Sequence, residues 1–366
     1  MPIPLVDLKA QLTEIGDEVR AGWDAVLAKT AFILGPDVAE LEKEYAAFCG
    51  SKYAIGVANG TDALELAMRA IGLGPGDEAI VPANTFIATA LAVARTGAKP
   101  VLCDVDPVHQ LIDPDKARAV VTSRTKAIVP VHLFGQCAPM EAIDALAKDK
   151  GLVVIEDAAQ SQGAERNGKR SGALSLVSGT SFYPGKNLGA FGDAGAVTTS
   201  DDGIAKKIRA LRNYGSEVKY HHPETGFNSR LDTLQAVVLR AKLKRLDKWN
   251  AQRRVAAERY ESLLAGVPGV VRPSTLGGNT HVWHLYVVRV GARDAVLKKL
   301  NDAGIGAGIH YPVPVHLQGA FAHLGHKDGD FPVSEKAAKE ILSLPMFPEI
   351  TPAQQEEVVG ALRAAL

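Results

Sequence analysis

Cysteine is scarce in this sequence. The three cysteines of the 366-residue chain are Cys49, Cys103 and Cys137, and no two of them form a C-x-x-C pair. An odd, scattered set of this kind argues against a disulfide framework and against a thiolate zinc site. The paired histidines at 221–222 and at 281 and 284 lack a nearby set of acidic or cysteine partners, so we expect no metal site.

Excess charge and long apolar runs are also missing. Lysine plus arginine and aspartate plus glutamate both number 41, so no overall field attracts nucleic acid or an acidic membrane surface. No apolar run reaches the roughly 18 residues that a membrane span needs. The first residues, MPIPLVDLKAQ, do not resemble a secretory signal. We therefore expect a cytoplasmic protein that binds neither nucleic acid nor membranes.

What the chain does have is a regular alternation of short apolar runs and helical patterns. Two amphipathic helices are expected first, from Leu8 to Val26 and from Val38 to Phe48. Apolar runs typical of strands then follow at 54–57, 79–81, 101–105, 127–131 and 153–156. Helical patterns lie between these runs, at 63–71, 86–95, 114–121 and 140–148. This alternation predicts an α/β fold with a mostly parallel sheet between layers of helices, and ligand binding at the carboxyl ends of the strands.

The pattern changes after Asp232. Long charged helical stretches come next, followed by a Gly/Pro-rich segment near 267–279, the strand-like run HVWHLYVVRV and further mixed strand and helix patterns. The length of the chain also suits a large domain and a smaller one. We expect a large domain at 1–245 and a smaller C-terminal α+β domain at 246–366.

Three motifs lie where the predicted strands end. The run VVIED places Asp157 at the binding edge of the sheet, although a strand-end acid alone could equally cap a helix or bind a metal. The stretch SFYPGKNLGAFGDAGA holds Lys186 among glycines, where low charge could lower the pKa of its amine. Taken alone, such a lysine is usually a solvated surface residue.

The third motif is Asn59-Gly60-Thr61-Asp62, at the start of a predicted helix. Backbone N–H groups and the helix dipole could bind a phosphate there, and the alternative is a capped helix without a ligand. A phosphate cup, an acid for a pyridine nitrogen and a lysine for an aldehyde are together what pyridoxal phosphate (PLP) needs.

These motifs resemble the DegT/DnrJ/EryC1/StrS family of sugar aminotransferases, within PLP fold type I (the aspartate aminotransferase fold). The resemblance runs from about Leu5 almost to the end of the chain. Its motifs are GTDALELAM, PANTFIATA, VIEDAAQSQGA, SFYPGKNLGAFGDAGA, GFNSRLD and HYPVPVHLQGAF.

The resemblance implies roles for individual residues. Lys186 would bond the cofactor covalently and move the substrate proton, and Asp157 would pair with the pyridinium nitrogen. The other implied cofactor contacts are Phe86 and Gln160 at the ring, and Gly60, Thr61 and Ser181 at the phosphate. Asn228 would reach the cofactor phosphate of a neighbouring subunit, which implies a homodimer with shared active sites. Its alternative is a turn residue close to Gly226.

The resemblance also implies a reaction. L-glutamate would give its amino group to the cofactor, and a keto sugar carried on a nucleotide would then accept it. The form SFYPGKNLGA, in place of an SFH segment, looks like the branch that aminates C-3 of dTDP-linked 3-keto-6-deoxyhexoses. The residues implied on the substrate side are Tyr183, Tyr214, His310, Tyr311 and His316. Arg212 and Arg230 are candidates for the donor's carboxylates.

Several alternatives stay open at this point. The sugar could be aminated at C-4, or it could be carried on UDP. The chain could be a PLP-dependent dehydratase of the same fold, although the lysine position is commonly histidine in that class. It could also bind PLP without catalysis, although such a protein should have lost Lys186 or Asp157.

Overall fold

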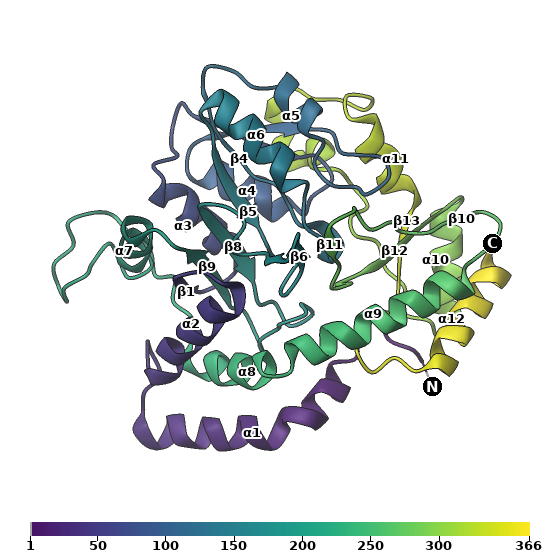
Figure 1. Ribbon diagram of the computed structural model, residues 1–366, viewed down its shortest axis with the longest axis horizontal. Coiled ribbons are helices and arrows are strands. Elements are labelled where there is room, and N and C mark those ends of the chain that lie inside the picture. The colour runs from purple at the N-terminus through teal and green to yellow at the C-terminus, as the bar shows by residue number, and fades with distance from the viewer. Residues whose placement is uncertain (1) are drawn as a thin grey trace.

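The computed structural model describes residues 2–366, and its centre is a seven-stranded sheet. The strand order is β1-β9-β8-β5-β4-β2-β3 (Figure 1). The strands are β1 (Tyr53–Val57), β2 (Glu78–Pro82), β3 (Lys99–Cys103), β4 (Thr125–Ile128), β5 (Val153–Asp157), β8 (Val177–Ser181) and β9 (Gly195–Thr199). The strands from β8 to β3 pair in parallel, whereas β9 runs antiparallel to both β1 and β8. The predicted α/β fold with a mostly parallel sheet is confirmed.

Helices cover both faces of this sheet because alternate strand residues point to opposite sides. Ala79 and Val81 pack in the cluster beneath α3 (Gly60–Ala70), α4 (Ile87–Arg95) and α7 (Asp202–Leu211). Ile80, between them, packs with α5 (Pro114–Ala119) and α6 (Met140–Lys150) on the other face. Near β1 and β9 that second face is covered by α2 (Pro36–Cys49) and α8 (Thr233–Leu243).

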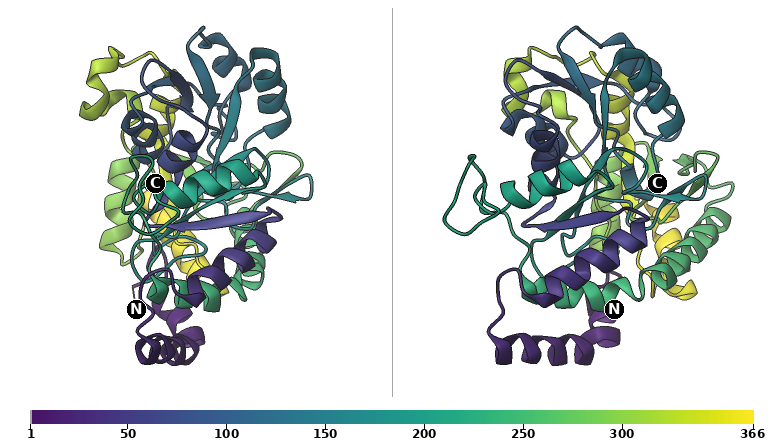
Figure 2. Two further views of the ribbon diagram at one scale, coloured as in Figure 1. Left: turned by 90° about the vertical axis from the view of Figure 1, so that its left-hand side faces the viewer. Right: turned by 60° about the vertical axis from the view of Figure 1, so that its left-hand side comes forward.

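The N-terminal helices form where the sequence predicts them. α1 (Leu8–Lys29) begins at Asp7, whose carboxylate accepts hydrogen bonds from the N–H groups of Lys9 and Ala10. It lies along α8 at the edge of the molecule (Figures 1 and 2). α2 ends at Gly50, where a positive φ of 80° favours glycine.

A second, smaller hydrophobic cluster is built around a three-stranded antiparallel sheet of β10 (Val270–Val271), β12 (Tyr286–Val290) and β13 (Ile341–Leu344). Its helices are α9 (Leu246–Leu263), α10 (Arg293–Asp302) and α12 (Pro352–Ala365), and α11 (Pro332–Glu340) leads into β13. Ile3 also packs in this cluster and pairs with Ile305, so the first residues cross from the small sheet to α1. A domain boundary at residue 245 stays a prediction.

Short elements complete the chain. These are β6 (Glu165–Arg166), β7 (Lys169–Arg170), β11 (Asn279–Thr280) and the 3-10 helices at Leu133–Gly135, Val315–Leu317 and Gly319–Leu324.

The strand expected over HVWHLYVVRV begins later than predicted, at Tyr286. The preceding residues make their backbone hydrogen bonds elsewhere: Val282 and Leu285 donate to the carbonyls of Gly135 and Phe134. Trp283 has a positive φ of 46°, which breaks an extended strand. The segment from His281 to Leu285 is therefore a bridge to the large sheet.

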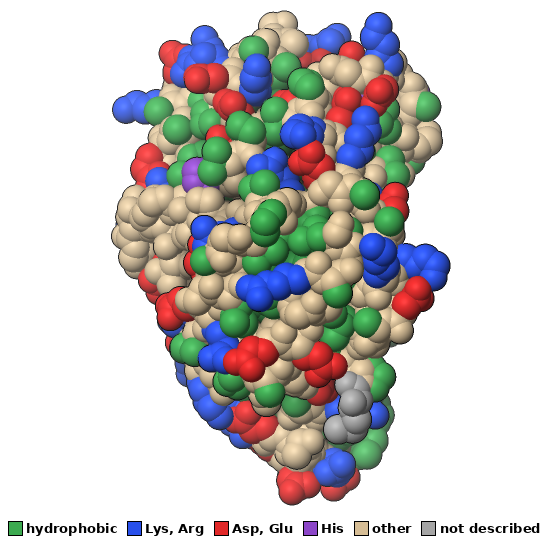
Figure 3. All heavy atoms as spheres, turned by 90° about the vertical axis from the view of Figure 1, so that its right-hand side faces the viewer, with side chains coloured by type: hydrophobic (Ala, Val, Ile, Leu, Met, Phe, Trp, Pro, Cys, Tyr) green, Lys and Arg blue, Asp and Glu red, His purple; other side chains and the backbone are tan. Residues whose placement is uncertain are grey.

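The surface carries both signs of charge. Figure 3 shows lysine, arginine, aspartate and glutamate side chains interspersed with hydrophobic ones over the face it presents. No helix within residues 2–366 is both long enough and apolar enough to cross a membrane.

Candidate active site

The carboxyl ends of β1, β2, β5 and β8 meet at one cavity of about 790 Å³. Ten of the residues predicted for the site line it, and they come from both parts of the chain. They are Gly60, Thr61, Phe86, Asp157, Gln160, Ser181, Tyr183, Lys186, His310 and Tyr311. The strand-end placement follows from the parallel pairing, which brings these chain segments to the same edge of the sheet.

Asp157 is the last residue of β5, and its side chain is buried. One carboxylate oxygen accepts a hydrogen bond from the Thr89 hydroxyl at 2.7 Å, and the other accepts from the Ala159 N–H at 3.1 Å. Burial raises the pKa of Asp157, and these two hydrogen bonds and the charge of Lys186 oppose that rise. The carboxylate is thus held in a fixed direction.

Lys186 lies on the loop between β8 and β9, where its N–H closes a turn onto the Tyr183 carbonyl at 2.8 Å. Burial lowers the pKa of its amine to about 8, and the charge of Asp157 opposes that shift. An amine with this pKa is neutral in about a tenth of molecules at pH 7, far more than an ordinary lysine, so it can act as a nucleophile or a base.

The N-terminus of α3 also lines the cavity. Asn59 caps the helix by accepting the Asp62 N–H at 2.9 Å, so Gly60 and Thr61 begin the helix at the cavity wall. A Cβ placed on Gly60 would lie 2.5 Å from the Ser181 Cβ, so only glycine permits this approach of the helix to β8. The closely packed helix end is suited to an anion such as a phosphate.

Aromatic and amide groups form the remaining walls. Phe86 is half exposed, and its ring lies 5.0 Å from the ring of Tyr311, measured between centroids. Gln160 donates to the Tyr311 hydroxyl at 3.1 Å and accepts from the Phe134 N–H at 2.6 Å. The Nδ1 atom of His310 lies 2.8 Å from the Ser343 hydroxyl, and burial lowers the pKa of His310 to about 4. This side of the cavity is therefore neutral and preorganised.

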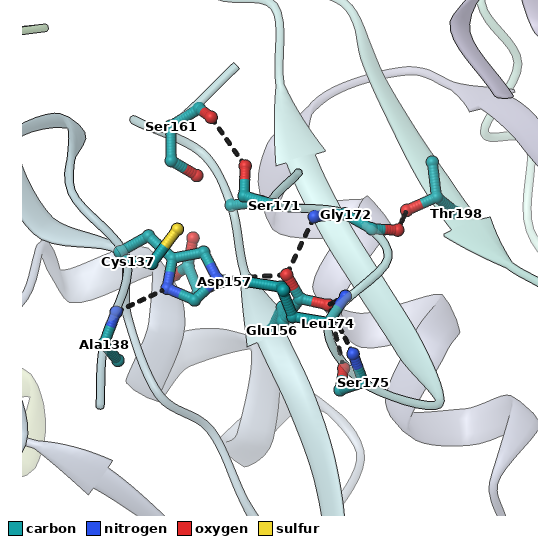
Figure 4. A network of polar contacts seen from close by, with 12 residues as sticks. Cys137, Ala138, Glu156, Asp157, Ser161, Ser171, Gly172, Leu174, Ser175 and Thr198 are labelled. Atoms are coloured by element: carbon teal, nitrogen blue, oxygen red, sulfur yellow. Dashed lines mark hydrogen bonds and ion pairs between the residues drawn. The ribbon is translucent and has the colours of Figure 1, made fainter. Parts of the chain in front are cut away.

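Glu156, the residue before Asp157 on β5, does not line the cavity, because other groups bind its carboxylate. Its fully buried carboxylate accepts hydrogen bonds from the backbone N–H groups of Gly172, Leu174 and Ser175 at 2.8 Å each, and it pairs with His132 Nε2 at 3.0 Å (Figure 4). The His132 Nδ1 atom accepts the Ala138 N–H at 3.1 Å, so the ring carries its proton on Nε2 and donates it to Glu156. Glu156 thus joins β5 to His132 and to the backbone of residues 172–175.

Three predicted residues do not line this cavity. His316 is fully buried, its Nε2 atom lies 2.9 Å from the Glu335 carboxylate, and its ring packs on Phe331. The structure thus gives it a role in joining the 3-10 helices to α11 and does not bring it to the site. Tyr214 lines a different, open cavity of about 1050 Å³. Asn228 is exposed on the segment that follows α7.

The two candidate arginines are also elsewhere. Arg212 is buried, donates to the Gly56 carbonyl at 2.7 Å and pairs with Glu42, so it joins β1 to α2. Arg230 lies beside Tyr214 in the open cavity and donates to the Asn213 side chain at 3.1 Å. Within one copy of the chain, neither arginine reaches the cavity that holds Lys186.

The sequence prediction missed some residues of the wall. Thr89 could have been found, because it lies one helical turn after Phe86 and faces the same side of α4. His284, Leu5 and Val6 also line the cavity, and the sequence carried no signal for them. In the part of the chain that the structure describes, no three His, Cys, Asp or Glu side chains gather as a metal site requires.

Comparisons with known proteins find relatives over nearly the whole chain. The profile of the DegT/DnrJ/EryC1/StrS aminotransferase family matches residues 13–363. The chain is 50% identical to a pleiotropic regulatory protein of Geobacillus stearothermophilus, over 98% of this chain and 97% of that one. It is 47% identical to dTDP-3-amino-3,4,6-trideoxy-alpha-D-glucose transaminase of Streptomyces venezuelae, over 99% and 95% of the two chains.

A solved structure is similar over almost the whole fold. The crystal structure of S. venezuelae DesV in complex with a ketimine intermediate superposes with a TM-score of 0.97 and 46% identity. The match covers 99% of this chain and 98% of that one.

Proposed function

This chain belongs to the DegT/DnrJ/EryC1/StrS aminotransferase family, and from that membership we propose its reaction. It transfers the amino group of L-glutamate to C-3 of a dTDP-linked 3-keto-6-deoxyhexose and releases the 3-amino sugar nucleotide. The observation that carries the proposal is the meeting of Lys186, Asp157 and the N-terminus of α3 at one cavity. The full-length similarity to a dTDP-3-amino sugar transaminase supports the choice of substrate.

The residues present fit pyridoxal phosphate. The end of α3, closed against Ser181, suits the phosphate, and the half-exposed Phe86 offers a ring face for stacking. Asp157, at the end of β5, would face the pyridine nitrogen, and Lys186 would hold the aldehyde carbon. When bound, this cofactor supplies an electron sink for the negative charge left at the amino acid Cα after proton loss.

The protein's own residues then do the proton chemistry. The Lys186 amine, whose pKa burial lowers in the cofactor-free protein, would act as the base that takes the proton from the Cα of glutamate. In the second half of the reaction the same amine would deliver a proton to C-3 of the sugar. The Asp157 carboxylate, fixed by Thr89 and Ala159, would pair with the ring nitrogen and favour its protonated form.

The substrate side is assigned to three further residues of the cavity wall. Tyr183 is 60% exposed and projects at the cavity, which suits contact with a sugar. His310 and Tyr311, which come from the small sheet side, would contact the nucleotide diphosphate and close the cavity over it. These substrate roles are part of the proposal.

A homodimer with shared sites is also part of the proposal. The segment between α7 and α8 projects from the body of the molecule (Figures 1 and 2) and carries the exposed Asn228. The next residue, Ser229, donates to Asp62 in the first turn of α3 at 2.8 Å. Exposed apolar side chains nearby, Phe32, Ile33 and Tyr220 among them, are suited to contact with a second copy.

A cytoplasmic location is proposed on the cysteines. Cys49, Cys103 and Cys137 are all free and buried. Burial raises the pKa of the Cys49 thiol to about 12, so it stays protonated and unreactive. A chain with free thiols of this kind suits a reducing compartment.

The first test is an absorption spectrum of the purified protein, before and after addition of L-glutamate. We expect the visible band of bound cofactor to be lost as the amino group is transferred. A panel of dTDP-3-keto, dTDP-4-keto and UDP-3-keto sugars should then restore the band, with the first most effective. Absence of the band even after added PLP would reject the cofactor, and preference for the 4-keto sugar would reject the C-3 assignment.

A further inference from the structure

Three buried polar side chains, joined at one end to the backbone carbonyl of a buried glutamine, form a continuous hydrogen-bonded row behind the cavity wall. The amide ladder, as this row is called here, consists of His284, Asn187, Asn250 and Gln162. The most exposed member, His284, is only 7% exposed. Buried polar groups of this kind are costly unless their hydrogen bonds are made, so their arrangement is specific.

The direction of each hydrogen bond in the ladder is determined. Asn187 Nδ2 lies 2.9 Å from both Asn250 Oδ1 and the Val282 carbonyl, so it must donate to them. Asn187 Oδ1 is therefore the acceptor toward His284 Nδ1, at 3.2 Å. His284 must carry its proton on Nδ1, and its Nε2 lone pair remains as an acceptor.

The Gln162 end of the ladder is bonded to residues of the cavity wall. Asn250 Nδ2 donates to the backbone carbonyl of Gln162 at 2.9 Å. The Gln162 side chain donates in turn to the carbonyls of Ser181, at 2.9 Å, and Ala159, at 3.2 Å. The ladder thus connects three residues of the site. They are Asn187, which follows Lys186, Ala159, which lies two positions after Asp157, and Ser181.

The His284 end of the ladder belongs to the bridging segment that leads into β12, and Asn250 belongs to α9. Asn187 is thus the point at which the lysine-bearing loop is fastened to the part of the chain beyond residue 245. Because displacement of a reacting group by about 1 Å can cost on the order of 10²-fold in rate, this attachment matters for catalysis.

We propose that His284 is a positioning residue for Lys186: its Nδ1–H holds the Asn187 side chain, and so fixes the backbone that carries the lysine. This inference rests on the proposed function for the role of Lys186. The ladder itself is independent of the substrate and applies to the cofactor-free protein as well.

Two substitutions at one position separate this role from a direct one in the cavity. In His284→Asn the amide nitrogen lies about where Nδ1 was, so the hydrogen bond to Asn187 can be kept. In His284→Gln the amide lies about where Nε2 was, so that hydrogen bond is lost. We expect His284→Asn to keep kcat within a few-fold of wild type. We expect His284→Gln to lower kcat on the order of 10²-fold, with a smaller change in KM for L-glutamate.

His281→Asn is the matched control. His281 is also buried and accepts the Trp283 N–H at 2.8 Å through Nδ1, but it does not line the cavity that holds Lys186. An asparagine oxygen can accept the same bond, so this variant should behave as wild type. A loss like that of His284→Gln would show that replacement of any buried histidine in this segment is harmful, and would overturn the assignment.

A second readout does not need activity. In the cofactor-free protein, the rate of Lys186 acetylation by acetic anhydride is followed against pH by mass spectrometry. The wild type and His284→Asn should titrate near a pKa of about 8. His284→Gln should titrate at a higher pH, because a loosened loop lets water reach the amine.

The outcomes separate the two proposals. Retention of kcat and of the labelling profile by His284→Gln, or their loss in His284→Asn, overturns the positioning role. Nitrogen-15 NMR of the wild-type histidines supplies a check without variants, since a His284 proton on Nε2 would also overturn it. If the wild type shows no transamination but the labelling profiles differ as stated, the ladder stands and the proposed function fails.

Discussion

Two adjacent carboxyl groups on β5 show how the surroundings of a residue decide its role. Glu156 is surrounded by backbone N–H donors and a histidine, whereas Asp157 receives only two hydrogen bonds and faces the cavity. A satisfied carboxylate stabilises its surroundings, and one with free acceptor capacity can still bind a ligand cation. From the sequence, Asp157 could be placed at the binding edge because it ends the strand, whereas its role at a cofactor nitrogen rested on family resemblance.

Substitutions should separate these two acids. Glu156→Gln places an amide NH₂ among N–H donors, so we expect the free energy of unfolding to fall by about 1–3 kcal/mol. Asp157→Asn keeps one oxygen for the Ala159 N–H and turns its NH₂ group toward the Thr89 hydroxyl, which can accept, so stability should fall less than in Glu156→Gln while kcat falls on the order of 10²–10³-fold. Urea unfolding and steady-state kinetics of both variants check this. An inactive but stable Glu156→Gln would contradict it.

The pH dependence of stability should report the environment of Lys186. Its pKa falls from 10.5 in a free lysine to about 8 in the folded, cofactor-free protein. Between these values the unfolded chain binds more protons, so the contribution of Lys186 to stability rises with pH across that window and is constant below it. Urea unfolding should therefore show that the free energy of unfolding of Lys186→Met exceeds that of wild type by less at pH 10.5 than at pH 8. An unchanged gap would mean that the folded amine has an ordinary pKa.

At the scale of elements, most helices and strands were predictable because their patterns are local. Neither β8 nor β9 was predicted as a strand, because VSGTS and GAVTT are short and only partly apolar, and the antiparallel direction of β9 was not predicted either. A signal was nevertheless present: a parallel return needs a crossover, usually a helix, and the Gly-rich stretch from 182 to 194 has no helical pattern. The amide ladder could not be predicted, because its members meet only in the fold.

The approach of α3 to β8 depends on one glycine and can be tested there. Gly60→Ala would place a Cβ 2.5 Å from the Ser181 Cβ, so the helix end must move away from the strand. We expect weaker PLP binding and a lower melting temperature. Gly360→Ala in α12 is the control, because nothing lies within 4 Å of its added Cβ, and there alanine should be neutral or slightly stabilising. Equal effects of both variants on PLP affinity would contradict a phosphate site at the N-terminus of α3.

At the scale of the whole molecule, the open cavity beside the segment between α7 and α8 is exposed to solvent in a single copy of the chain. Tyr214 and Arg230, both predicted for the site, lie there with Ile33 and Leu34. If the proposed dimer forms, these residues and Asn228 would face the neighbouring copy.

Mixing of inactive variants tests shared sites directly. Lys186→Ala should still fold and bind PLP noncovalently, but it should not turn over. Asn228→Ala should bind the cofactor weakly if the neighbouring copy contributes this side chain. After subunit exchange between the two, mixed dimers would hold one site with both native residues, so activity should reappear. A monomeric mass by sedimentation, or no recovery on mixing, would reject the shared site.

The antiparallel strand β9 also has a consequence for the order of folding. β1 precedes the phosphate cup but finds its pairing partner, within the described residues, only in β9: Tyr53 lies opposite Thr199. Gly195, at the start of β9, packs directly on the backbone of Asn59 and Gly60. A contact of such high sequence separation forms slowly and cannot form on the ribosome until the chain has grown past residue 199. The cofactor cup is therefore completed late during synthesis, after the parallel strands between have been made.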